Sequence, residues 1–255
     1  MVNKRTTSVD RRLVIHVAQA IPEDVPEEVI KAHLQEAALS HRLIRGLLSV
    51  DPAMVNEEVF FQVLGGKIRE FKDPNSVLER IHALGGLFAQ ARLTTVPGGE
   101  TLGSQRDRVI VFWTDWHWKD DERVRLTVAP SIASQVVYLE GLVEGSLGCT
   151  YDKTEEEGRK YVQGILDSLP KVKGLRWTLG NTPTVNRILA NHLKETGKYL
   201  LPYVYTWTTD EYENKTSGLC RLVAGVFHSL GVFVRRLRPC ESNDFVGLFV
   251  LGVPE

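Results

Sequence analysis

Cysteine is scarce in this sequence of 255 residues, which contains only three. Cys149, Cys220 and Cys240 are far apart, and no two of them form a Cys-x-x-Cys pair. An odd number at this spacing indicates neither a disulfide framework nor a zinc site. We therefore expect the chain to work in a reducing compartment, and the cytoplasm is the simplest location.

Long apolar runs and an excess of one charge are also missing. No stretch is apolar over a length that could span a bilayer, and the start lacks the apolar core of a signal peptide. The formal net charge of −1 argues against a general polyanion binder, which normally carries a clustered positive excess. The sequence thus predicts no membrane contact and leaves both a protein and a nucleic acid open as partners.

No complete catalytic signature occurs in the chain. The Gly-x-Ser-x-Gly elbow, the His-Glu-x-x-His helix, the Walker A loop and the Gly-x-Gly-x-x-Gly loop are all missing. The sequence leaves open whether the protein is an enzyme. Our leading hypothesis is a soluble protein that binds a partner or ligand without catalysis, and the alternatives depend on two candidate sites described below.

Alternating strand-like and helix-like runs fill the C-terminal part of the chain. The patterns predict helices over 160–169, from Thr182 to Gly197 and over 219–230, and strands over 175–179, 200–207, 232–237 and 245–253. Strands joined by helices favour parallel pairing, while the last two strands are close enough to pair antiparallel. We predict an α/β (or α+β) fold, in which a helical N-terminal region precedes a mixed, partly parallel sheet flanked by helices.

The N-terminal part has helical spacing of its apolar residues. One helix is predicted over 27–48, and another begins at the cap pair Asp73-Pro74 and ends before the turn at Gly85-Gly86. Glycine and proline are frequent over 94–108, which is the best candidate for a linker. The predicted domains are a helical region over 1–93, a linker over 94–108 and an α/β domain over 109–255.

The first candidate site lies between the strand over 175–179 and the next helix. Thr182 is expected to cap this helix, whose first free amides and dipole could hold a phosphate group. The site residues are Thr178, Gly180, Asn181, Thr182 and Thr184. In order, Thr178, Gly180, Asn181 and Thr182 resemble the phosphate loop of flavodoxins, which implies binding of a phosphate-bearing ligand. The resemblance is local, because Trp177 and Asn186 depart from that pattern, and we interpret it as convergent.

A polar loop predicted over 208–217 extends this site. In a parallel sheet it would lie at the same edge as the Gly180 loop, and would bring Asp210, Asn214 and Lys215 toward a shared crevice. In an antiparallel sheet the two loops need not be neighbours. The alternative interpretation of the Gly180 loop is a helix cap and turn without a ligand.

The second candidate site is a carboxylate group for Mg²⁺ or Mn²⁺. Asp115 and Asp210 follow predicted strands and Asp244 precedes one, and oxygen ligands at rigid strand ends suit these metals. Such a site would fit a metal-dependent nuclease or phosphodiesterase. Aspartates at strand ends are also ordinary turn and cap residues, which is the alternative.

Three tryptophans lie close together in a predicted hairpin over 109–128. Trp113, Trp116 and Trp118 could form a stacking platform or a protein-interaction surface. Because Trp116 and Trp118 share one face of a strand, packing in the core is the alternative.

Overall fold

The structure is a computed structural model of the chain, and it describes residues 68–105, 109–112, 128–148, 155–214, 218–237 and 244–255. The helices are α5 (Pro74–His82), the 3-10 helix η2 (Gly86–Gln90), α6 (Leu102–Gln105), α8 (Glu155–Ser168) and α9 (Thr182–Thr196). The strands are β1 (Arg92–Val96), β2 (Ser134–Tyr138), β3 (Leu175–Leu179), β4 (Tyr205–Asn214), β5 (Gly218–His228), β6 (Gly231–Leu237), β7 (Val246–Gly247) and β8 (Val250–Pro254).

The first sheet is antiparallel throughout and has the strand order β1-β2-β8-β3. β8 is an inner strand, although it lies latest in the sequence of the four. It pairs with β2 through Val137 and Gly252, and with β3 from Leu175–Pro254 to Leu179–Val250. The sheet therefore joins segments that are far apart in the chain.

The second sheet has the order β6-β5-β4-β7 and is mixed. β4, β5 and β6 form an antiparallel meander, and the short β7 pairs in parallel with the start of β4. This sheet and the helices confirm the predicted α/β (or α+β) class with a mixed, partly parallel sheet. Residues 1–67, which include the predicted helix over 27–48, lie outside the described residues.

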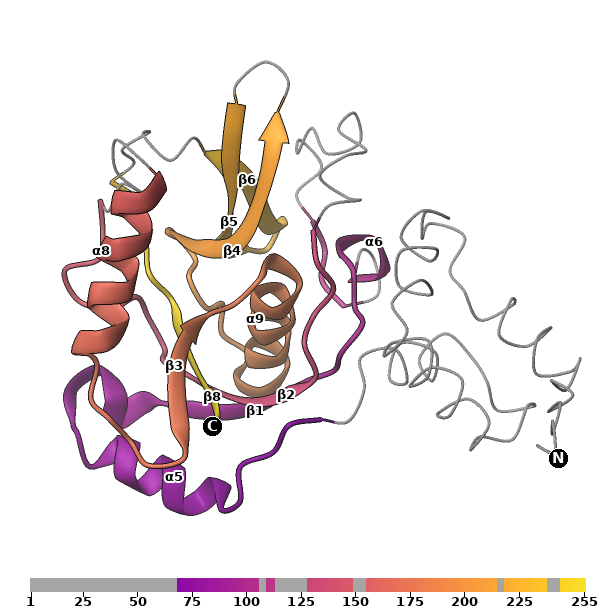
Figure 1. The fold of residues 1–255 in the computed structure, drawn as a ribbon. Helices are drawn as coiled ribbons and strands as arrows, with labels where there is room; N and C mark the ends of the chain where they lie inside the picture. Colours follow the sequence, from indigo (N-terminus) through magenta and orange to yellow (C-terminus); the bar gives the residue numbers. More distant parts are fainter. Residues whose placement is uncertain (1–67, 106–108, 113–127, 149–154, 215–217, 238–243) are drawn as a thin grey trace, which may run out of the picture.

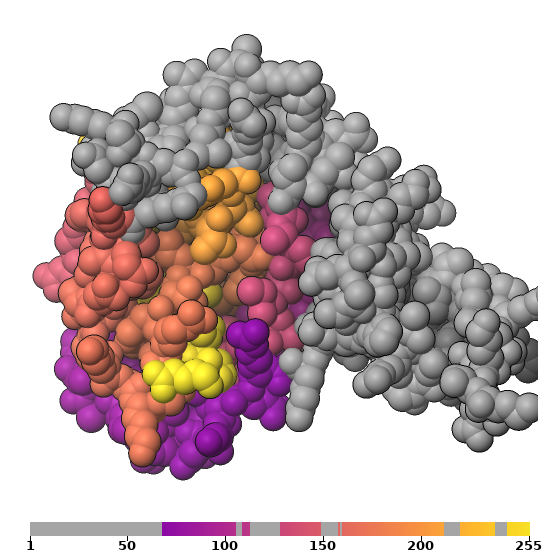
Figure 2. Space-filling view, in the orientation of Figure 1, coloured from indigo at the N-terminus to yellow at the C-terminus, as the bar shows by residue number. Residues whose placement is uncertain are grey.

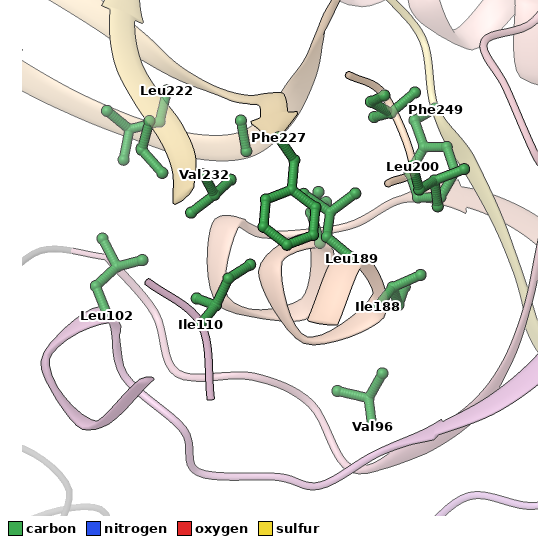
Figure 3. Packing of buried hydrophobic residues seen from close by; sticks show 14 of the residues in the cluster. Val96, Leu102, Ile110, Ile188, Leu189, Leu200, Leu222, Phe227, Val232 and Phe249 are labelled. Carbon is green, nitrogen blue, oxygen red and sulfur yellow. The ribbon is translucent and has the colours of Figure 1, made fainter. Parts of the chain in front are cut away.

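Helix α9 lies between the two sheets (Figure 1). It packs against β4 and β5 on one side and against β1 and α6 on others. The apolar stripe of this helix is Val185, Ile188, Leu189 and Leu193. The first three are fully buried and share one core with both sheets, while Leu193 is half-buried against that core. Figure 3 shows Phe227 reaching from the second sheet toward Leu189 on this helix.

A second core covers the opposite face of the first sheet. Val77 and Ile81 of α5 and Val162 of α8 belong to it, together with Val137 and Val250 of the sheet. β2 and β8 are thus buried on both faces. Figure 2 shows the C-terminal residues, yellow, at the surface, where the backbone N–H of Glu255 donates to the carbonyl of Gly174.

The cap signals in the sequence are confirmed with one correction. Asp73 caps α5 by accepting a hydrogen bond from Ser76 N at 3.0 Å, as predicted. The cap of α9, however, is Asn181, so that Thr182 is the first helical residue and not the cap. Gly197, with a φ of 69°, ends α9 in the left-handed conformation expected of a terminal glycine.

The helix predicted over 219–230 is wrong, because this segment is strand β5. Its neighbours β4 and β6 cover its edges, and residues 220–225 are all buried. A strand that is buried on both faces loses the alternation of apolar and polar residues. The apolar spacing of Leu222, Val223 and Phe227 therefore imitated that of a helix.

Three strand predictions also change. β4 starts only at Tyr205 and continues to Asn214, so most of the loop predicted over 208–217 is strand. The single strand predicted over 245–253 is divided between β7 in the second sheet and β8 in the first. β3 and β4 are not parallel neighbours, and β6 and β8 do not pair, because in each case the two strands belong to different sheets.

The described part of the predicted linker belongs to the folded structure. The segment predicted as a linker contains the end of β1 and α6, and Val96 within it is fully buried in the core. The division of the whole chain into domains stays a prediction. In the part of the chain that the structure describes, no helix has the length and apolar character needed to cross a membrane.

Candidate functional site

The first turn of α9 holds most of the residues predicted to bind phosphate. Asn181 Oδ1 accepts from Thr184 N at 3.1 Å, and its Nδ2 donates to the carbonyls of Ala129 and Pro130, both at 2.9 Å. The Asn181 carbonyl accepts from Val185 N at 3.0 Å, while Pro183 has no N–H to offer. The backbone amides of Thr184 and Val185 are therefore already bound by other groups of the chain.

The remaining amide of this turn binds Asp210. Thr182 N donates to Asp210 Oδ2 at 2.6 Å, and the hydroxyl groups of Thr182 and Thr208 are 3.2 Å apart. Thr209 N also donates to the Gly180 carbonyl at 3.0 Å. A carboxylate of the second sheet thus occupies the position at the helix N-terminus where a bound anion would sit.

Burial governs the charge of this carboxylate. Asp210 is 7% exposed, and burial raises the pKa of its carboxyl group, while the hydrogen bonds from Thr182 and the charge of Arg221 act in the opposite direction. Arg221 is itself buried and forms an ion pair with Glu211, its cross-strand neighbour. The cluster is therefore closed and internally paired, as in a structural helix cap.

The other predicted site residues are dispersed. The Thr178 hydroxyl donates to the neighbouring Leu179 carbonyl at 3.2 Å, and Asn214 ends β4 opposite Gly218. Asp244 is exposed before β7. Lys215, Asp115, Trp113, Trp116 and Trp118 lie outside the described residues. Among the residues that are described, no three His, Cys, Asp or Glu side chains form a group that could hold a metal ion.

A pocket at the far end of α9 was not predicted. It has a volume of about 310 Å³ and lies between the last turns of α9, the end of β5 and the segment before Phe112. Ile110, Leu193 and Phe227 supply apolar surface, and Lys194 and His228 supply polar groups. This volume lies at the lower end of the range of roughly 300–1,000 Å³ that is usual for small-molecule sites.

A strained bulge in β5 directly precedes Phe227 and His228, which line one wall of the pocket. The register of β5 on β6 shifts between Gly225 and His228, and Gly225 has a φ of 143°. The next residue, Val226, has a φ of 42°, which a β-branched side chain rarely adopts. Its N–H donates to the Val204 carbonyl at 2.8 Å. Backbone strain and bulges occur preferentially beside functional sites, where they direct side chains.

Close backbone contacts hold the opposite wall. Val232 N donates to the Val111 carbonyl at 2.8 Å. A Cβ atom on Gly231, which has a φ of 115°, would lie 2.4 Å from that oxygen, so only glycine fits. The side chains of Val111 and Leu230 beside the pocket are each 59% exposed. The pocket therefore has fixed walls and an apolar rim.

Little in the sequence indicates this pocket. Its lining comes from three separated segments, residues 109–111, 190–199 and 227–231. The glycines at 225 and 231 were a usable signal, because an isolated glycine in an apolar run is typical of a bulge or a close backbone approach. Because we predicted a helix over 219–230, we did not interpret either glycine as a sign of a bulge or a close approach.

Comparisons of this chain with protein-family models, with curated proteins and with solved structures found no match.

Proposed function

We propose that the chain is a binding protein, and that its binding site is the pocket between the end of α9 and the bulge of β5. The observation that carries this proposal is the strained backbone at Gly225 and Val226, which directly precedes Phe227 and His228 in the lining of a pocket of about 310 Å³. Strain of this kind costs about 1–3 kcal/mol per residue and persists only where the surrounding structure compensates for it. A preformed pocket binds a ligand with little further ordering.

The rim of the pocket supports the same proposal. Val111 and Leu230 expose large apolar surfaces beside the opening, and Tyr199 in the lining is 39% exposed. Apolar side chains gathered around a concavity are typical of a ligand site. The ligand we propose is a small molecule with an apolar body, and we place the protein in the cytoplasm because of its cysteine usage.

The alternative functions stay predictions. A phosphate or nucleotide at the Gly180 loop would have to displace the Asp210 carboxylate from Thr182 N, which disfavours it. A Mg²⁺- or Mn²⁺-dependent nuclease would need Asp115, and a protein or nucleic-acid partner at the tryptophan surface would need Trp113, Trp116 and Trp118. These four residues lie outside the described part of the chain.

Filling the pocket tests the proposal. Ala190 lies in the lining, so Ala190→Leu should remove the space for a ligand while α9 stays intact. We expect saturation-transfer NMR to detect 4-phenylbutyrate or its neutral amide, 4-phenylbutanamide, on the unaltered protein and not on this variant. Ala83→Leu, the same change at an exposed position after α5, is the matched control and should keep the signal. Binding that persists in a folded Ala190→Leu protein would contradict the proposed site.

A further inference from the structure

The polar side of the pocket consists of groups that can donate hydrogen bonds. Lys194, Tyr199, His228 and Ser229 contribute to the lining, and no aspartate or glutamate occurs among the lining residues, all of which the structure describes. A lysine ammonium group donates three hydrogen bonds and accepts none. The lining therefore offers several hydrogen-bond donors to a ligand that carries acceptors. It offers no carboxylate to a cation.

Lys194 has no acidic residue three or four positions away on its helix, although Glu195 follows it directly in the sequence. The positions three and four residues away are Ala190, Asn191, Gly197 and Lys198. The Lys194 side chain also makes no ion pair or hydrogen bond with any residue that the structure describes. Its ammonium group is thus available to an anion that enters the pocket, and a charge-assisted hydrogen bond is stronger than a neutral one.

The apolar side of the pocket is aromatic as well as aliphatic. The rings of Tyr199 and Phe227 meet edge to face, with centroids 5.0 Å apart and an interplanar angle of 85°. Leu193 and Ile110 complete this surface. Such a pair leaves ring faces and edges that suit another aromatic or aliphatic group.

From this arrangement, and resting on the proposed function, we infer that the ligand is a small amphipathic organic acid. Its single carboxylate pairs with Lys194 at the polar side, and its apolar body lies against Phe227 and Leu193. No covalent step is involved. The pocket discriminates between an acid and its neutral amide, because only the acid adds the attraction between opposite charges to the hydrogen bond from the Lys194 ammonium group.

A matched pair of ligands and a matched pair of variants test this inference. NMR titration should give 4-phenylbutyrate an affinity about fivefold higher than that of 4-phenylbutanamide, a preference of about 1 kcal/mol. Lys194→Gln should remove this preference and Lys194→Arg should retain it. Lys198→Gln, an equal loss of charge one turn away and outside the lining, should leave it unchanged. Raising the salt concentration should lower the affinity for 4-phenylbutyrate and not that for 4-phenylbutanamide. The reason is that the Lys194 side chain is exposed, so that salt screens its charge.

The outcomes separate this inference from the proposed function. Equal affinity of acid and amide, with both lost in Ala190→Leu, would overturn the anionic ligand and leave the pocket as a binding site. A preference for the acid that survives Lys194→Gln would also overturn the role of Lys194. No binding of either compound by the unaltered protein would overturn both the inference and the proposed function.

Discussion

At the scale of single residues, four polar residues of α9 each bind a different element, Thr182 through its backbone N–H and the other three through their side chains. The pairs are Thr182 with Asp210 of β4, Arg187 with Glu100 before α6, Asn191 with Thr94 of β1, and His192 with Tyr138 of β2. These groups are largely buried, and removing one partner leaves the other without compensation. The pairs therefore fix the position of the helix more strongly than apolar packing alone would.

The cap at Asp210 gives a direct prediction. Asp210→Ala leaves the buried Thr182 N–H without an acceptor, so we expect the free energy of unfolding to fall by about 1–3 kcal/mol. Asp210→Asn keeps an acceptor oxygen and removes the buried charge, and should cost less than half as much. Urea unfolding at pH 7 measures both changes.

Asp244→Ala is the control for these variants, because Asp244 is exposed before β7. The free energy of unfolding of this variant should stay within about 0.5 kcal/mol of that of the unaltered protein. If Asp210→Ala unfolds at the same urea concentration as Asp244→Ala, the carboxylate does not serve as the cap of α9.

At the scale of elements, the bulge of β5 requires glycine at one position. A Cβ atom on Gly225 would lie 2.3 Å from the Val204 carbonyl oxygen, and the φ of 143° is unfavourable for any other residue. We expect Gly225→Ala to destabilise the fold by roughly 2–4 kcal/mol. Thermal unfolding followed by circular dichroism measures this loss.

Gly164→Ala is the opposite case, since Gly164 is exposed within α8 and a Cβ atom there would contact nothing within 4 Å. It should stabilise the protein by up to about 1 kcal/mol. A Gly225→Ala variant as stable as Gly164→Ala would show that the bulge is not constrained in this way.

Elements with local signals could be predicted from the sequence. The Asp73-Pro74 cap defines α5, the Asn181 region and Gly197 delimit α9, and β3 matches its predicted range. β5 could not be predicted, because its strand conformation depends on β4 and β6 covering its edges. Strand propensity is a property of such surroundings more than of the segment itself.

The candidate sites also depend on contacts between distant segments, which the sequence does not show. We predicted that the Gly180 loop and Asp210 would meet at the edge of a parallel sheet. β3 and β4 belong to different sheets, but Thr182 N still binds Asp210. The sequence could not indicate that the carboxylate would fill the site, since this depends on how β4 is placed. The pocket needs the Val232–Val111 contact and the bulge together, and no short segment encodes both.

At the scale of the whole molecule, α9 is the layer that joins two sheets, and its contact with the first sheet depends on a titratable group. His192 is 3% exposed, and its Nδ1 lies 3.1 Å from the Tyr138 hydroxyl oxygen. Burial lowers the pKa of His192 below its ordinary value of 6.5. The charged groups that act on it, in both directions, are Glu140, Arg92, Glu195 and Lys198.

This shift predicts how stability depends on pH. The unfolded chain takes up a proton at His192 near pH 6.5, whereas the folded protein does so only at lower pH. The free energy of unfolding should therefore fall as the pH decreases from about 6.5, by at most about 1.4 kcal/mol per pH unit for one proton. His192→Gln keeps a partner for Tyr138 and should flatten this slope.

Urea unfolding between pH 7.5 and 5 measures the slope. His82→Gln, at an exposed position at the end of α5, is the control, because the glutamine amide can keep the hydrogen bond to the Ala91 carbonyl. We expect this variant to have the slope of the unaltered protein. An equal slope in His192→Gln would show that another group governs the acid sensitivity.

The bulge of β5 also makes the pocket a convenient place for protein engineering. The ladder between β5 and β6 is regular from Arg221 to Gly225, and after the bulge only His228 pairs again with Gly231. Ser229 and Leu230, the two turn residues between His228 and Gly231, are exposed. Exchanging these two side chains should leave the register of the meander unchanged, so a library at positions 229 and 230 should alter the proposed ligand preference while the scaffold stays constant.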